Sequence, residues 1–204
     1  MGRVRILDRA QSRLPQPWRT VIDWAVTIVV AVGIVLAVEA EVAKPYRIPS
    51  ASMEPTLHCA RPINGCTAPF GDRVIVDRLA YRLGEPKRGQ IVVFEAPAAA
   101  RVRCGGGEGG TFVKRLIGLP GDRVSLRNGF VSVNGKRLAE PYVSPSRRGQ
   151  DTRTFPRVPA GRYFFLGDNR TGSCDSRVWG TVPRSSLIGP VRARYWPPTR
   201  LDWR

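Results

Sequence analysis

Two serine hydroxyls lie close together in a short segment, residues 48–57. Ser50 and Ser52 flank a small residue, and Pro55 prevents a long helix from following them. A serine acts as a nucleophile when a base takes its proton and preorganised donors bind the oxyanion that forms. Covalent catalysis by a serine is therefore the first chemistry that this sequence suggests.

The base for such a serine has few candidates. The chain contains a single histidine, His58, so a Ser-His-Asp triad would have to use it. The alternative is Lys114, which lies among apolar residues and is one of only four lysines among 33 basic residues. Burial lowers the pKa of a lysine into the range of a general base, whereas arginine keeps its proton. A surface lysine with its stem on apolar neighbours would give the same pattern without catalysis.

A polar segment, residues 166–177, follows an aromatic run. It contains Asp168, Ser173, Asp175 and Arg177. Asx and Ser side chains could simply hold a turn here. The functional interpretation is a wall of the site, in which a serine hydroxyl orients the lysine and an Asp–Arg pair makes the loop rigid.

The elements that must position these groups are predicted to be strands. Beyond Lys44 the apolar runs are short, rich in β-branched and aromatic residues, and separated by Gly and Pro; they are 74–76, 91–94, 131–133 and 163–166. Asn-Gly pairs at 128–129 and 134–135 predict hairpin turns. Only residues 77–83 indicate a helical turn, and 101–110 is expected to be a glycine-rich loop without the ending of a phosphate-binding loop. The predicted class is mainly antiparallel β.

The N-terminal part has a different composition. A basic tail, residues 1–20, precedes an apolar run at 24–38. Asp23 lies directly before this run and Glu39 directly after it. This run covers about 22 Å as a helix, against a bilayer core of roughly 30 Å. We expect a single transmembrane anchor over 21–43, with the tail cytoplasmic and residues 44–204 outside. A cleaved signal peptide and a buried core helix are the alternatives.

Composition limits the remaining classes. The 204 residues are 42% apolar, enough for a core, and carry a formal charge of +17. Such a charge could indicate nucleic-acid binding. The arginines are scattered without a nucleic-acid motif, however, so we expect no nucleic-acid partner and favour attraction to an anionic membrane surface.

Four segments occur together and in order: 49–57, 71–76, 113–122 and 167–180. With the basic tail and the apolar run, they resemble the bacterial type I signal peptidases, membrane-bound serine endopeptidases that remove signal peptides from exported proteins. The resemblance implies a Ser-Lys dyad, with Ser52 as nucleophile and Lys114 as general base. It also implies an oxyanion hole from the Ser52 N–H and the Ser50 hydroxyl, and a hydrogen bond from Ser173 to the Lys114 amine. The implied ion-pair support consists of Asp175, Arg177 and Arg115, with Asp168 nearby.

The resemblance further implies two antiparallel β parts: a catalytic domain within 44–204 and a short insertion at about 123–162. Substrates are signal peptides of exported preproteins with small residues at the first and third positions before the cut. The peptide would bind extended beside residues 111–113. Shallow pockets would exclude larger side chains, and their lining would be Ile48, Met53, Leu57, Phe112 and Val113. The enzyme would lie in the cell membrane, in contact with the lipid bilayer, as a monomer without cofactor or metal.

The four cysteines suggest two disulfides in an oxidising compartment. Cys59 and Cys66 flank a Pro-Asn-Gly turn, which predicts a local bridge. Cys104 and Cys174 would then pair, tying the glycine-rich loop to the segment of Ser173. A zinc site is the alternative, although no CxxC motif is present.

Two other functions remain open on the sequence. One is a self-cleaving Ser-Lys domain like that of SOS-response repressors, which would be soluble and carry its own Ala-Gly cleavage site and a DNA-binding domain. The other is a non-enzymatic basic β protein that binds anionic lipid or polymer. His58, six residues after Ser52, is the rival candidate for the base, and we expect it to be an ordinary polar residue instead.

Overall fold

The computed structural model describes residues 16–104 and 110–203. The chain divides into two compact units, residues Met1–Glu41 and Val42–Arg204. Most of the predicted basic tail, residues 1–15, lies outside the described residues. The same holds for 105–109 in the predicted glycine-rich loop.

The N-terminal unit contains helix α2 (Gln16–Val42). Large apolar side chains are exposed along it, among them Trp24, Ile28 and Ile34. Within the described ranges, no helix combines the length and the apolar character needed to cross a membrane. The membrane anchor expected at 21–43 stays a prediction of the sequence.

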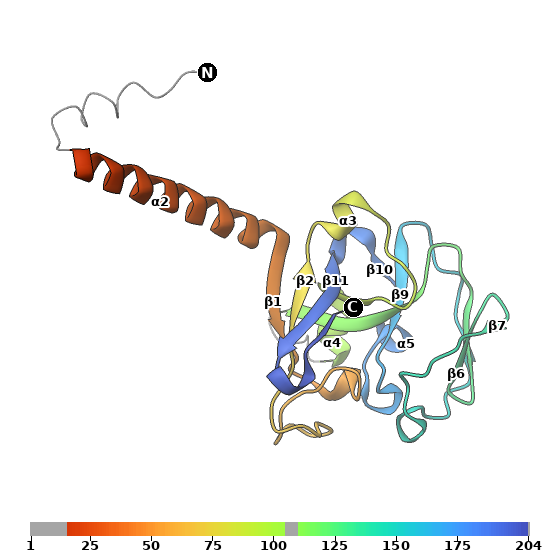
Figure 1. Ribbon diagram of the computed structural model, residues 1–204. Helices are drawn as coiled ribbons and strands as arrows, with labels where there is room; N and C mark the ends of the chain where they lie inside the picture. Colours follow the sequence, from red (N-terminus) through yellow and green to blue (C-terminus); the bar gives the residue numbers. More distant parts are fainter. Residues whose placement is uncertain (1–15, 105–109, 204) are drawn as a thin grey trace. The chain divides into compact units, whose positions relative to one another are not determined.

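The second unit is built on an eight-stranded antiparallel sheet (Figure 1). The strand order is β1-β2-β11-β3-β4-β9-β10, and β12 pairs with β11. The strands are β1 (Ala43–Arg47), β2 (Arg73–Asp77), β3 (Ile91–Glu95), β4 (Thr111–Gly118), β9 (Arg162–Leu166), β10 (Val182–Pro183), β11 (Leu187–Trp196) and β12 (Asp202–Trp203). All named pairings are antiparallel, so the predicted mainly antiparallel β class is confirmed.

A second, four-stranded sheet lies between β4 and β9 in the sequence, in the order β7-β6-β5-β8. Its strands are β5 (Val124–Arg127), β6 (Phe130–Val133), β7 (Lys136–Arg137) and β8 (Arg153–Thr154). Both predicted hairpins are present, β5–β6 and β6–β7. At their turns Asn128 and Asn134 have φ of 49° and 52°, and the glycines that follow have φ of 75° and 83°. Asn and Gly tolerate this left-handed backbone, which gives a two-residue turn the twist of its strands.

Short helical segments complete the unit: α3 (Ala80–Leu83), α4 (Ala98–Cys104), α5 (Ser176–Trp179), and the 3-10 turns η1 (Ala51–Met53), η3 (Pro145–Arg147), η4 (Arg170–Gly172), η5 (Arg184–Ser186) and η6 (Pro198–Arg200). The predicted helical turn at 77–83 contains α3. Helix α4 corrects the loop prediction for 101–104. Three alanines, residues 98–100, and the arginines after them favour helix over loop.

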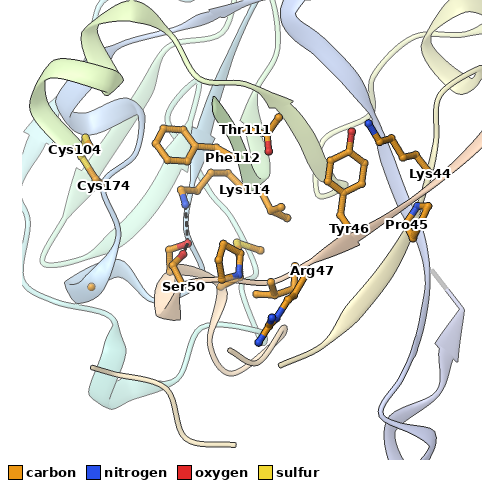
Figure 2. Close-up of a pocket in the computed structure, with 16 residues that line it drawn as sticks. Lys44, Pro45, Tyr46, Arg47, Ser50, Cys104, Thr111, Phe112, Lys114 and Cys174 are labelled. Carbon is orange, nitrogen blue, oxygen red and sulfur yellow. Dashed lines mark hydrogen bonds between the residues drawn. A yellow bond between two sulfur atoms is a disulfide. The ribbon is translucent and has the colours of Figure 1, made fainter. Parts of the chain in front are cut away.

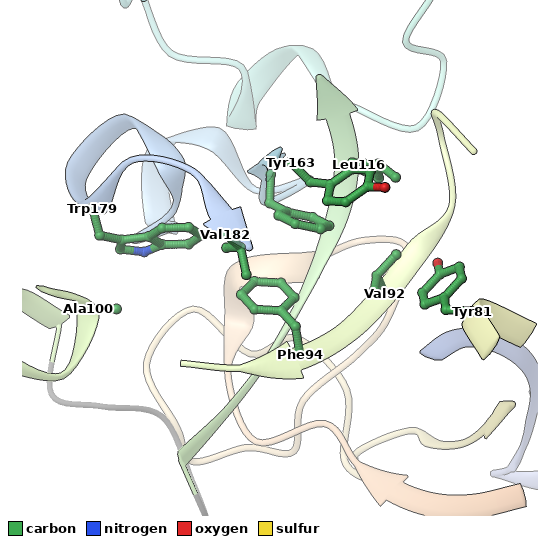
Figure 3. Packing of buried hydrophobic residues seen from close by; sticks show 9 residues of the cluster. Tyr81, Val92, Phe94, Ala100, Leu116, Tyr163, Trp179 and Val182 are labelled. Atoms are coloured by element: carbon green, nitrogen blue, oxygen red, sulfur yellow. The ribbon is translucent and has the colours of Figure 1, made fainter. Parts of the chain in front are cut away.

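Strand β4 contributes to three hydrophobic clusters. Leu116 packs in the first with Phe94, Phe165 and Trp179 (Figure 3), where the Phe94 and Phe165 rings stack at 4.5 Å between centroids. Val113 packs against the second cluster, which contains Ile48, Met53 and Leu57. The third joins Ile117 to apolar residues of the small sheet. Because β4 contributes to all three clusters, its backbone is a rigid support for the polar side chains that it carries.

Candidate active site

Ser52 lies in the 3-10 turn η1, with only 7% of its surface exposed. Lys114 Nζ donates a hydrogen bond of 2.6 Å to Ser52 Oγ. Ser50 Oγ lies 3.2 Å from the same oxygen, and either hydroxyl can be the donor. Figure 2 shows the Lys114 side chain reaching from its strand toward these serines. The two segments that carry the serines and the lysine are 62 positions apart along the chain, and the fold brings them into direct contact.

Lys114 lies on β4 opposite Val92 of β3 and is 3% exposed. Its Nζ is 5.2 Å from the centre of the Phe112 ring. Burial lowers the pKa of Lys114 from 10.5 to about 8, and the charges of Asp175 and Asp168 oppose that shift. About a tenth of the amine is therefore neutral at pH 7, which arginine could not provide at this position.

The nucleophile turn is held by Asn169, a residue that the sequence analysis did not single out. Its backbone N–H donates to the Ser52 carbonyl at 3.1 Å, and its Nδ2 donates to the Ala51 carbonyl at 3.0 Å. Asn169 is buried, so both bonds are shielded from water. One indication of a role for Asn169 was present in the sequence, namely its position inside the polar segment 166–177.

His58 is engaged away from the nucleophile. Its Nδ1 contacts the buried carboxylate of Glu54, and its backbone N–H donates to Asp72 at 2.9 Å. The hydrogen bonds described for Ser52 Oγ are those with Lys114 and Ser50. The geometry thus places the lysine, and not the imidazole, beside the candidate nucleophile.

Two separate ion pairs flank the lysine, where the sequence analysis expected one group. Arg115 binds Asp168 with two hydrogen bonds, of 2.8 and 2.6 Å. Arg177 binds Asp175 with two, of 2.8 and 2.9 Å. Asp175 also accepts from the Gly167 N–H at 3.0 Å. These paired guanidinium–carboxylate bonds hold strand β4 and the polar segment 166–177 in place around the site.

The small sheet region is joined to this framework by charged and aromatic contacts. Arg170, beside Asn169, is buried and pairs with the buried carboxylate of Glu140. The guanidinium of Arg115 lies over the ring of Tyr142 at 3.7 Å. Residues near 140 therefore support the segments that hold Ser52 and Lys114.

The predicted hydrogen bond from Ser173 to the Lys114 amine is not present. Ser173 Oγ is buried and has no hydrogen-bond partner among the described residues. The reason is that Lys114 Nζ is directed to Ser52, while the Ser173 hydroxyl packs over Gly167, where an added Cβ would collide with it.

Replacing Gly167 by alanine is expected to damage both stability and turnover. A Cβ there would lie 2.5 Å from the Ser52 carbonyl oxygen and would overlap the Ser173 hydroxyl. Overpacking of this kind lowers the free energy of unfolding by about 1–3 kcal/mol. To relieve the clash, the backbone of the turn that carries Ser52 would have to move. Denaturant unfolding and peptide cleavage would measure it. Gly84→Ala is the control, because its Cβ would meet only Ala80 O at 3.4 Å; equal losses in both variants would contradict the argument.

A cavity of about 790 Å³ opens beside the serines and the lysine (Figure 2). Four of the five predicted pocket residues line it: Ile48, Met53, Phe112 and Val113. Leu57 does not, because it is completely buried in the second hydrophobic cluster. Thr111, beside which the peptide was expected to bind, lines the cavity too. Residues that the sequence analysis did not predict also line the cavity: Lys44, Pro45, Tyr46, Arg47 and Gly172.

Both cysteine pairs are joined as disulfides, Cys59–Cys66 and Cys104–Cys174. The first lies beside Ala51 in a small buried cluster. The second lines the cavity. With all four sulfurs oxidised, no thiolate remains for a zinc site.

The sequence model of the family "Signal peptidase, peptidase S26" matches residues 21–196. The chain belongs to this family. A signal peptidase I of Leptolyngbya laminosa is 40% identical over 177 residues, covering 86% of this chain and 79% of that protein. A probable signal peptidase I-2 of Synechocystis sp. is 37% identical over 96% of this chain and 83% of its own length.

Two further members of the signal peptidase family are similar to this chain. A signal peptidase I of Mycobacterium tuberculosis is 34% identical, covering 94% of this chain and 78% of that protein. A solved signal peptidase I structure from Enterococcus faecalis aligns with a TM-score of 0.43 at 34% identity, over 52% of this chain and 97% of its own. Membership of the peptidase family makes this chain a serine endopeptidase.

Proposed function

We propose that this peptidase cleaves signal peptides from exported preproteins, with Ser52 as nucleophile and Lys114 as general base. The observation that carries the assignment is the 2.6 Å hydrogen bond between Lys114 Nζ and Ser52 Oγ in a buried setting. Relatives that match most of the chain are named signal peptidase I, which supports signal peptides as the substrates.

The proposed reaction begins when the neutral Lys114 amine takes the proton of Ser52 as Oγ attacks the scissile carbonyl carbon. The oxyanion accepts hydrogen bonds from the Ser52 N–H and the Ser50 hydroxyl, which lies 3.2 Å from Ser52 Oγ. The ammonium of Lys114 then returns the proton to the leaving amine as the peptide bond breaks. Water attacks the acyl-enzyme with Lys114 again as base, which releases the signal peptide and restores Ser52.

Substrate binding is proposed along β4. Strand β3 pairs with the whole of 111–115, whereas the pairing of β9 with β4 begins at Arg115. An extended peptide can therefore add as a strand beside residues 112–113, the mode known as β-augmentation. Ile48, Met53 and Val113 line that part of the cavity, and their bulk would limit the first and third positions before the cut to small residues.

The test uses purified protein and a preprotein with alanine at both positions. We expect one cut, after the alanine at the first position, and a new N-terminus identified by sequencing. Leucine at either position should lower kcat/KM at least about tenfold, because a pocket wall must be displaced. Cleavage that ignores these positions, or absence of any cut, would contradict the proposal.

The pH dependence of kcat/KM follows from the lysine. Because burial lowers the pKa of Lys114 to about 8, the ammonium predominates below that pH. We expect kcat/KM to fall about tenfold for each pH unit below 8 and to level off above it. The His58→Ala variant should show the same profile. A profile with its midpoint at about 6.5, the ordinary value for histidine, that disappears in His58→Ala would assign the base to the histidine instead.

Anchoring of the peptidase to a bilayer through residues 21–43, with 1–20 cytoplasmic and 44–204 extracytoplasmic, is a prediction of the sequence. The apolar side chains exposed along α2 support it, because water does not favour such a surface. The full chain should float with lipid vesicles in a density gradient, and Val30→Asp with Ile34→Asp should prevent this. Val178→Asp, at an exposed apolar residue outside α2, is the control; equal flotation of all three proteins would reject the anchor.

A further inference from the structure

The Cys104–Cys174 disulfide forms part of the wall of the active-site cavity. Cys104 ends helix α4, and Cys174 directly follows Ser173. Both line the same cavity as Ser52 and Lys114, and Figure 2 shows the bridge near Phe112. A second contact holds the two segments together, since Arg103 Nη1 donates to the Val178 carbonyl at 2.9 Å. The mechanism proposed above does not use this disulfide.

Side chains of β4 divide the cavity into two sides. Phe112 and Lys114 are two residues apart and share a face of the strand, while Val113 lies on the opposite face. Phe112, Cys104 and Cys174 all pack against the cluster that contains Phe94 and Trp179, and the Phe112 and Trp179 rings are stacked at 6.2 Å. Val113 packs instead against the cluster of Ile48 and Met53. The disulfide therefore belongs to the Phe112 side.

An extended peptide beside β4 would present its side chains to these two sides alternately. If its first and third residues before the cut lie on the Ile48–Met53–Val113 side, as proposed above, the second residue lies on the other side. That side is formed by Phe112 and the disulfide. Side chains at the second position would then meet a wall that the two small residues never touch.

We propose that the Cys104–Cys174 disulfide and Phe112 form a third subsite, which receives the substrate residue between the two small ones and limits its size. This inference rests on the proposed function. The wall consists of an aromatic ring and a disulfide, so the subsite suits uncharged, apolar side chains and makes sulfur and ring contacts with them. A covalent bridge tied to α4 at one end and to the Ser173 segment at the other cannot turn away as a free side chain can. Bulky residues at the second position are therefore disfavoured.

The test compares peptides that differ only at the second position before the cut, with alanine, leucine or tryptophan. The wild type should cleave the alanine and leucine peptides well and the tryptophan peptide poorly. In the Cys104→Ala/Cys174→Ala variant, the ratio of kcat/KM for tryptophan over alanine should rise about tenfold, the range for a changed apolar pocket. Cys59→Ala/Cys66→Ala is the matched control, which should leave that ratio unchanged. A uniform fall for all peptides, or the same rise in both double variants, would overturn the subsite.

A second pair of variants keeps both disulfides. Phe112→Ala should relax selection at the second position, and Val113→Ala should relax it at the first and third. The reverse pattern, or relaxation at every position in both, would overturn the division of the cavity. The Ser52→Ala protein is run in parallel: failure of the wild type to cleave any of these peptides would reject the proposed function itself, whereas cleavage without the predicted selectivity rejects only the subsite.

Discussion

Replacing Ser52 by alanine is expected to reduce kcat by on the order of 10⁶-fold, as the removal of a nucleophile does in another serine peptidase. The variant loses the oxygen that forms the acyl bond, and among the described residues that line the cavity no other hydroxyl is hydrogen-bonded to Lys114. Fold and substrate binding should persist, because alanine fits the 3-10 turn η1, whose backbone is held by Asn169. Peptide cleavage and a thermal unfolding curve measure the two properties separately.

The matched control is Ser50→Ala, two residues earlier. Ser50 is proposed only to donate to the oxyanion, so its loss should cost about 10²–10³-fold in kcat, with little change in KM. Equal losses for the two serines would leave the nucleophile unassigned. Cleavage by Ser52→Ala at more than a few per cent of the wild-type rate would contradict the assignment of Ser52 as the nucleophile.

Replacing Lys114 by arginine should be almost as damaging, by about 10⁴-fold or more, although the charge type is retained. A guanidinium does not give up its proton near neutral pH, so it cannot act as the base. Lys114→Met, which fills a similar volume without a charge, should be equally inactive. His58→Ala should retain most of the activity, because its ring contacts Glu54 and not Ser52. If His58→Ala were inactive and Lys114→Met active, the dyad would be wrong.

Lys114 should also make the free energy of unfolding depend on pH. Its pKa is lowered in the folded protein from 10.5 to about 8, so between these values the unfolded chain binds a proton that the folded chain has released. The free energy of unfolding should therefore rise with pH across that interval. Denaturant unfolding at pH 7.5 and 10 should show this increment in the wild type and not in Lys114→Met. The double variant Ser52→Ala/Lys114→Met should be no slower than Ser52→Ala alone, because the two residues act as a unit.

Local signals in the sequence predicted much of the fold. Short β-branched runs became strands of the main sheet, and the Asn-Gly pairs became tight turns because few other residues accept positive φ there. Helix α4 was not predicted, because the glycines after Cys104 dominated the interpretation of that segment. The three alanines at 98–100, which have a high helix propensity, favour the helix that forms there.

At the candidate site, residue types were easier to predict than contacts. The rarity of lysine drew attention to Lys114, and the structure places it against Ser52. The partner of Ser173 and the position of Leu57 depend on packing between distant segments, which no local pattern encodes. The role of Asn169 was invisible for the same reason, since its partners are backbone carbonyls 117 and 118 positions earlier.

The turn at Asn134–Gly135 provides a place to attach a reporter to this molecule. Gly135 itself must stay, because its φ of 83° strains other residues, but the neighbouring Lys136 and Arg137 are exposed. The hairpin that carries the turn has its own apolar cluster, which packs on Ile117 at the far end of β4 from residues 111–113. A short epitope or a fluorescent label grafted at this tip could follow the protein in cells while leaving its cleavage chemistry undisturbed.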